Sequence, residues 1–148
     1  ADLPTATLLI GKGDYDALKA GKEGAEAASV ALVRWISGGA RTNAVSGDHD
    51  VFGDGSVVML DTPGHTPGHH SLLVKLAETG PVLLTGDLAH FRENYDANGV
   101  PVFNTDRADS LASMARFKGV AKNTSATVII QHEPGDIGKL PAFPASAR

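Results

Sequence analysis

Short apolar runs bounded by glycine, proline or polar residues recur along the chain. Their length and their content of valine, leucine and isoleucine are typical of β-strands rather than helices. The pattern predicts strands at residues 6–10, 56–60, 71–76, 82–84 and 126–130. Between Val51-Phe52 and Val57-Val58, the dipeptide Asp54-Gly55 predicts a tight hairpin turn that leads into the second of these strands.

Three longer segments carry the residue spacing of amphipathic helices. We expect a brief helix over residues 14–20 and a longer one over residues 23–37, each stopped by glycine. A third helix is capped by Asp106 or Thr105 and runs to about residue 122. The apolar face of the second helix is predicted from Ala27, Val30, Ala31 and Val33, widened by Leu32, Trp35 and Ile36. That of the third is predicted from Ala108, Leu111, Met114, Ala115 and Lys118. Residues 90–99 and the tail with its prolines are predicted as loops.

Strands pair as hairpins in the middle of the chain and alternate with helices later, which predicts a mixed α/β sandwich. A length of 148 residues with 42% apolar content suits one globular domain. The formal charge of −4 without a basic run gives no sign of binding to nucleic acid or to an anionic membrane. No apolar run approaches the roughly 20 residues that cross a bilayer. Because the sequence has no cysteine, any metal site must use nitrogen and oxygen ligands.

Residues 61–70, with the sequence Asp-Thr-Pro-Gly-His-Thr-Pro-Gly-His-His, join two of the predicted strands. His65 and His69 are spaced like a metal pair on one helical turn, but a helix interior does not accommodate two Pro-Gly dipeptides. The histidines therefore belong to a rigid turn, which fixes the direction of an imidazole with little flexibility. A histidine on such a turn can also serve only as a hydrogen-bonding residue.

Asp87 and His132 also follow predicted strands directly, as His65 does. Loops at the same end of neighbouring strands can converge, so these three side chains could form one site. Imidazole nitrogens with a carboxylate oxygen suit zinc, and also iron, manganese or cobalt. The ordinary alternatives are that Asp87 caps a turn and that His132 is a surface residue. His69 and His70 are expected to support the site or to pack, and Asp61 to orient an imidazole.

Three motifs in this order resemble those of the metallo-β-lactamase superfamily. The segment Thr-Pro-Gly-His-Thr-Pro-Gly-His at residues 62–69 is similar to the family's third metal-ligand motif, especially in N-acyl-homoserine lactonases and glyoxalase-II-like enzymes. Leu-Thr-Gly-Asp at residues 84–87 and Ile-Ile-Gln-His at 129–132 resemble its two later motifs. The family's first motif, His-x-His-x-Asp-His, is absent from these residues. The resemblance implies that residues 1–148 are the C-terminal portion of a single αββα sandwich domain within a longer protein.

The resemblance also implies a reaction and a ligand set. In the complete family site, two divalent metal ions, here expected to be zinc, share a bridging hydroxide and a bridging carboxylate, and they open an ester or lactone without a serine or cysteine nucleophile. His65 would bind one ion, His132 the other, and Asp87 both. The substrate would be a small-molecule lactone or ester. Glyoxalase-II-like thioester hydrolysis is the alternative reaction, and the non-enzymatic alternative is an inactive metal-binding fragment that assembles with itself or with its missing N-terminal portion.

His90 stands three residues after Asp87, where the related lactonases usually carry a tyrosine that points at the substrate carbonyl. A histidine there could donate a hydrogen bond to substrate, protonate the leaving group, or act as an extra metal ligand. We therefore include His90 as a candidate catalytic residue. The simpler alternative is that it begins an exposed loop.

Overall fold

The computed structural model describes residues 5–21, 26–142 and 144–148. A two-stranded parallel sheet is formed by β1 (Leu8–Gly11) and β2 (Thr42–Val45). A five-stranded sheet contains β3 (His49–Asp50), β4 (Val57–Asp61), β5 (His70–Leu76), β6 (Gly80–Leu84) and β7 (Thr127–Ile129), in that order. The helices are α1 (Lys12–Lys19), α2 (Glu26–Ile36), α3 (Arg92–Ala97) and α4 (Arg107–Thr124), with short 3-10 turns η1 (Gly86–Leu88) and η2 (Pro134–Lys139).

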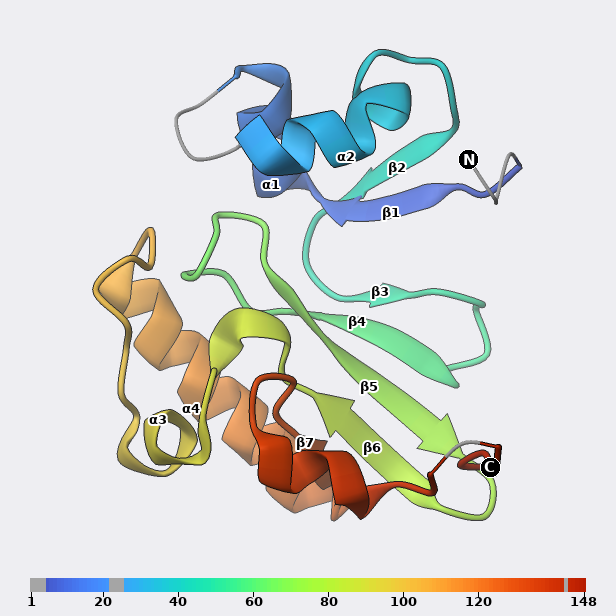
Figure 1. Cartoon of the computed structure of the whole chain (residues 1–148), viewed down its shortest axis with the longest axis vertical. Coiled ribbons are helices and arrows are strands. Elements are labelled where there is room, and N and C mark those ends of the chain that lie inside the picture. Colours follow the sequence, from blue (N-terminus) through green and yellow to red (C-terminus); the bar gives the residue numbers. More distant parts are fainter. Residues whose placement is uncertain (1–4, 22–25, 143) are drawn as a thin grey trace.

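The helices lie on the outside of the two sheets. Figure 1 shows α1 and α2 against the two-stranded sheet and α4 against the five-stranded sheet. The predicted mixed α/β fold is therefore confirmed, in an order of helix, sheet, sheet and helix. In the described part of the chain, no helix has both the length and the apolar character needed to span a bilayer.

Strand direction determines where the connecting loops meet. Strands β3 to β6 pair antiparallel in sequence, and β7 joins β6 in parallel, with Leu83 opposite Val128. Because β4, β6 and β7 then run in the same direction, their C-terminal ends share one edge of the sheet. The loops after Asp61, Leu84 and Ile129 leave from that edge.

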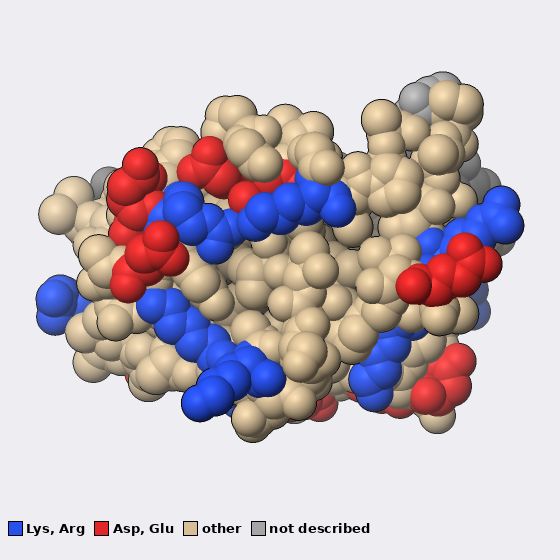
Figure 2. All heavy atoms as spheres, turned by 90° about the horizontal axis from the view of Figure 1, so that it is seen from below, with Lys and Arg blue, Asp and Glu red and all other residues tan. Residues whose placement is uncertain are grey.

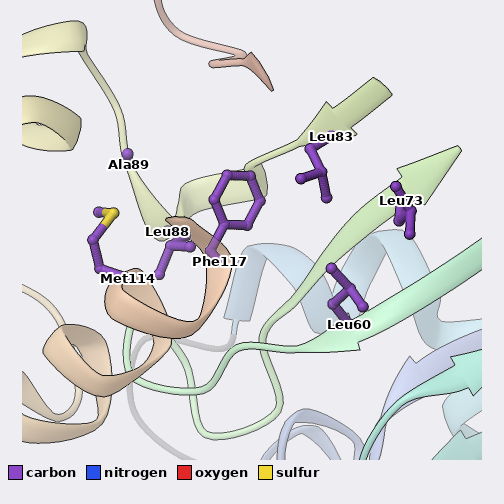
Figure 3. Packing of buried hydrophobic residues seen from close by; sticks show 7 residues of the cluster. All are labelled: Leu60, Leu73, Leu83, Leu88, Ala89, Met114 and Phe117. Carbon is purple, nitrogen blue, oxygen red and sulfur yellow. The ribbon is translucent and has the colours of Figure 1, made fainter. Parts of the chain in front are cut away.

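The core lies between the five-stranded sheet and α4. Val58, Leu73, Leu83 and Val128 are cross-strand neighbours in one row, and Phe117 and Met114 of α4 pack in the same cluster (Figure 3). Phe117 is fully buried, and Tyr95 of α3 meets its ring edge-on at a centroid distance of 6.2 Å. Burial of these side chains is the main source of stability for this half of the molecule.

The predicted apolar stripe of α4 was shifted from the observed one. The cap at Asp106 is confirmed, since its carboxylate accepts the Asp109 N–H at 2.8 Å. Met114 is a core residue as predicted, but Ala108 and Ala115 are exposed. The buried face consists of Ser110, Ser113, Met114 and Phe117.

The apolar face predicted for the second helix is correct only in part. Val30 and Val33 of α2 are 77% and 58% exposed, whereas Leu32, Trp35 and Ile36 are half-buried. The predicted start at residue 23 lies outside the described residues, as does the side chain of Ala27.

Three loop predictions need correction. The connection from β3 to β4 is a six-residue loop, and Asp50 holds it by accepting the N–H groups of Phe52, Gly53 and Gly55. It is therefore not a two-residue Asp-Gly turn. Residues 92–97, predicted as loop, form α3, and residues 134–139 of the tail form η2.

Figure 2 shows Lys and Arg side chains lying among Asp and Glu side chains on one face, so neither positive nor negative charge forms an extended patch there.

Candidate metal centre

The edge where β4, β6 and β7 end brings together His65, Asp87 and His132. His132 Nε2 lies 2.8 Å from Asp87 Oδ1, and His65 Nε2 lies 3.4 Å from Asp87 Oδ2. The predicted convergence of these three side chains is confirmed, while metal binding by them stays a prediction. About two fifths of the Asp87 side chain is exposed.

Asn104 fixes the orientation of the His65 ring. Ser110 Oγ donates to the Asp106 carbonyl at 2.6 Å, so it accepts from Asn104 Nδ2 at 2.9 Å. The amide oxygen of Asn104 then faces His65 Nδ1 at 3.2 Å and accepts its proton. His65 Nε2 is thereby left as a lone pair directed at Asp87, which is the tautomer that a metal ligand needs.

His69 supports the backbone of Asp87. The Asp87 N–H donates to His69 Nε2 at 2.9 Å, and His69 Nδ1 lies 2.9 Å from the Thr62 carbonyl, which accepts its proton. Burial is the largest influence on this ring and lowers the pKa of His69. Gly86 passes so close that a β-carbon there would lie 2.6 Å from His69 Nε2, and its φ of 57° also favours glycine.

His70 has a different partner set. Its two ring nitrogens lie 2.8 Å and 3.1 Å from the carbonyl oxygens of Gly68 and Gly47. Asp61 approaches this ring, at 3.9 Å, and not that of His65. The prediction that His69 and His70 support the site or pack agrees with these contacts. Asp61 was predicted to orient an imidazole, but the ring it approaches is that of His70, which is not a candidate ligand.

His90 lies among the candidate ligands. Its ring stacks on His132 with a centroid distance of 5.2 Å and an interplanar angle of 13°, and it meets Phe103 edge-on at 5.4 Å. One ligand atom from each of Asp87, His90 and His132 lies within 4.8 Å of the others. Burial, and secondarily the neighbouring imidazoles, lower the pKa of His90 against the opposing effect of Asp87. A neutral imidazole is the form that binds metal.

The pKa of Asp87 is also shifted. Burial on its own raises this pKa, but the hydrogen bond from His132 and the electrostatic effect of the neighbouring imidazoles outweigh it, so the pKa of Asp87 lies below its ordinary value. Asp87 is thus an ionised carboxylate surrounded by imidazoles. This donor set fits a divalent metal ion of borderline character.

Two carboxylates outside the centre hold its loops, and no sequence pattern pointed to either. Asp14 of α1 accepts the Gly68 N–H at 2.7 Å and the Thr66 hydroxyl at 2.8 Å, which anchors the loop that carries His65. Asp136 accepts the Ile130 N–H at 2.9 Å and pairs with Arg92 at 2.6 Å. It thereby joins the segment after β7 to the segment that follows His90.

The chain is similar in sequence to proteins of one known family. The family model described as the metallo-beta-lactamase superfamily matches residues 11–132. The chain is 37% identical over 98 residues to "N-acyl homoserine lactonase AttM" of Rhizobium radiobacter, which covers 64% of this chain and 37% of that protein. It is 40% identical over 89 residues to an N-acyl homoserine lactonase of Bacillus sp, covering 60% of this chain and 34% of that protein.

Solved structures give the same relationship. The chain superposes with a TM-score of 0.78 and 27% identity on an N-acyl homoserine lactone hydrolase that carries N-hexanoyl-L-homoserine at its catalytic metal centre, covering 96% of this chain and 53% of that one. A quorum-quenching N-acyl homoserine lactone hydrolase gives a TM-score of 0.77 at 28% identity, covering 95% and 54%. The chain therefore spans about one third of these curated relatives and about half of these structures.

Proposed function

The chain belongs to the metallo-beta-lactamase superfamily, and we propose that it forms the C-terminal portion of one such domain, in a metal-dependent hydrolase of small-molecule lactones or esters. The observation that carries the proposal is the contact of Asp87 with both His65 and His132 at the shared edge of the sheet. N-acyl homoserine lactones are the proposed substrates because the relatives that align with these residues are named for that activity.

Each residue of the centre has a proposed role. His65 would help to hold one ion, His132 the other, and Asp87 both, with zinc as the proposed metal. When bound, the metal would make water nucleophilic near neutral pH and polarise the substrate carbonyl. Asn104 keeps Nε2 of His65 unprotonated for this purpose. Phe103, two-thirds exposed and edge-on to His65 and His90, offers an apolar surface for the acyl part of a substrate.

The alternatives lead to different expectations. Glyoxalase-II-like hydrolysis would use the same centre on a thioester, and the names of the relatives favour the lactone. If these residues act without the first family motif, each ion has one imidazole and a shared carboxylate, which is too few ligands for a catalytic zinc site. We therefore propose that the 148-residue chain alone has little hydrolase activity and that association with itself or with an N-terminal portion completes it.

Ring opening of N-hexanoyl homoserine lactone by the zinc-loaded protein tests the proposal. The protein from the complete reading frame should open the lactone, the 148-residue chain should remain near the rate without protein, and Asp87→Asn should abolish the activity of the longer protein. Faster hydrolysis of a thioester than of the lactone would favour the glyoxalase-II-like alternative. Full activity of Asp87→Asn would contradict the proposed role of the carboxylate.

A further inference from the structure

We propose that Asp87, His90 and His132 form a site for one divalent metal ion that this chain holds without further ligands, with His90 as a direct ligand. The inference deepens the proposed function and rests on its metal-binding part. It assigns His90 to the metal rather than to the substrate, and it makes metal binding independent of the first family motif.

Position supports the assignment. His90 follows η1 at the end of β6, and His132 follows the parallel neighbour β7, so both imidazoles reach the carboxylate from adjacent segments. Their ligand atoms and that of Asp87 lie within 4.8 Å of one another. Ligand atoms around one tetrahedral zinc ion stand about 3.4 Å apart, given zinc–nitrogen distances of about 2.0–2.1 Å. Because none of these atoms is more than 4.8 Å from another, adjustments of no more than about 1–1.5 Å, within reach of side-chain rotation, bring the three to these distances.

The unsatisfied polar atom of His90 is the second observation. Nδ1 of His90 is buried and has no hydrogen-bond partner, and no hydrogen bond of either ring nitrogen is present among the described residues. Buried polar atoms are almost always paired, because an unpaired one loses its solvation without compensation. A metal ion is the partner that would relieve this cost at a ring already surrounded by ligand-type side chains.

The rings around His90 restrict its freedom. His132 stacks on one face, while His65 and Phe103 meet it at 60° and 89°. A ring confined in this way loses little further conformational freedom when a small side-chain rotation brings it onto a metal. Two imidazoles and one carboxylate are also a ligand set that proteins use for zinc and iron.

Titration of the metal-free chain with Co²⁺ and Zn²⁺ tests the site. Wild type should bind one ion per chain, and the ring nitrogen signals of His90 and His132 should shift in ¹⁵N spectra while those of His49 stay in place. His90→Phe keeps a ring between His132 and Phe103 but removes both nitrogens. We expect it to weaken binding about 100-fold, since even indirect supporting residues contribute about 10- to 100-fold.

Two further measurements separate a ligand from a packing residue. The metal-free His90→Phe protein should melt at or above the temperature of wild type, because the unpaired buried nitrogen is gone, and its melting temperature should rise less on zinc addition. The matched control is His49→Phe, at a half-buried histidine of β3, which should bind metal as wild type does. If His90 acted only in packing, the Phe ring would replace it and the affinity for metal would be unchanged, and the inference would be wrong.

Asp87→Asn distinguishes the two proposals. If Asp87→Asn loses the metal and His90→Phe retains it, the proposed metal centre stands and the assignment of His90 fails. If neither variant changes the affinity, the proposed metal centre itself fails.

Discussion

At the scale of single residues, hydrogen bonds to a side-chain amide and to a backbone carbonyl determine the orientation of two of the histidine rings and which nitrogen of each ring carries the proton. The convergence of His65, Asp87 and His132 could be predicted from the sequence, because each follows a strand. Asn104 could not, because its contact with His65 crosses 39 residues and depends on Ser110 to orient the amide. Sequence patterns report the ends of strands, whereas partners of this kind become visible only when loops are placed in space.

The role of Asn104 leads to a prediction. Asn104→Ala leaves His65 free to carry its proton on Nε2, so we expect affinity for zinc to fall by about 10- to 100-fold. Competition with a chromophoric chelator measures the change. Asn123→Ala, at an exposed position of α4, serves as the control, and equal affinities for the two variants would show that Asn104 does not act on His65.

At the scale of elements, α4 shows the limit of apolar periodicity, which predicts the position of the helix correctly but assigns its buried face to the wrong residues. Ser110 and Ser113 are buried because their hydroxyls donate to the carbonyls of Asp106 and Pro63 at 2.6 Å and 2.7 Å. Sequence reasoning counts serine as polar and expects it at the surface. The short loop helix α3 was missed for a related reason, since its residues carry no regular apolar spacing and it packs through Tyr95.

The buried face of α4 can be tested at Phe117. We expect Phe117→Ala to lower the free energy of unfolding by about 3–5 kcal/mol, through lost burial and an unfilled cavity. Phe52→Ala, at a side chain that is 71% exposed, should change it by no more than about 0.5 kcal/mol. Urea denaturation of the metal-free variants gives both values, and similar losses would mean that α4 packs differently.

The η2 turn depends on a buried carboxylate, which makes its stability sensitive to acid. Burial alone raises the pKa of Asp136, but hydrogen bonds from Lys139 and from the Ile130 N–H, together with Arg92, lower it below its ordinary value. Above about pH 4 the unfolded chain has also lost this proton, so the stabilisation is fully present. Below that pH the unfolded state binds the proton first, and the stabilisation decreases as the pH falls through the pKa of the folded state.

Asp136→Asn should therefore lower the free energy of unfolding at pH 7 by about 1–3 kcal/mol, as expected for lost hydrogen bonds to a charged group. The difference from wild type should shrink as the pH falls from about 4 to 3. Denaturation curves at several pH values measure it. Asp96→Asn on the surface of α3 is the control, and a difference that does not depend on pH would contradict the linkage.

At the scale of the whole molecule, one contact joins the two-stranded sheet and its helices to the metal centre. The first turn of α1 packs on the backbone of residues 67 and 68, so closely that a β-carbon at Gly13 would lie 2.6 Å from the Pro67 carbonyl oxygen. Asp14 adds two hydrogen bonds at the same place. The overall sandwich could be predicted from the alternation of strands and helices, but this junction could not, because it consists of backbone contacts and one carboxylate.

Asp14→Ala should lower both the stability and the affinity for zinc, because it removes the acceptor of the Gly68 N–H and the Thr66 hydroxyl. We expect about 1–3 kcal/mol in the free energy of unfolding. Asp16→Ala on the same helix breaks only an exposed ion pair with Lys12, which typically contributes about 0–1 kcal/mol. Thermal melts with and without zinc compare the two variants. An unchanged affinity for zinc in Asp14→Ala would show that α1 does not influence the metal centre.

The parallel pairing of β6 with β7 has a consequence for the timing of folding. Asp87 and His132 are 45 residues apart in the chain, and they meet only after α4 has crossed over and β7 has docked. Such long-range closure comes late in folding. An ion bound there stabilises contacts that are absent from the transition state, so zinc should slow unfolding and leave the folding rate nearly unchanged. Stopped-flow refolding and unfolding with and without zinc would measure the two rates separately.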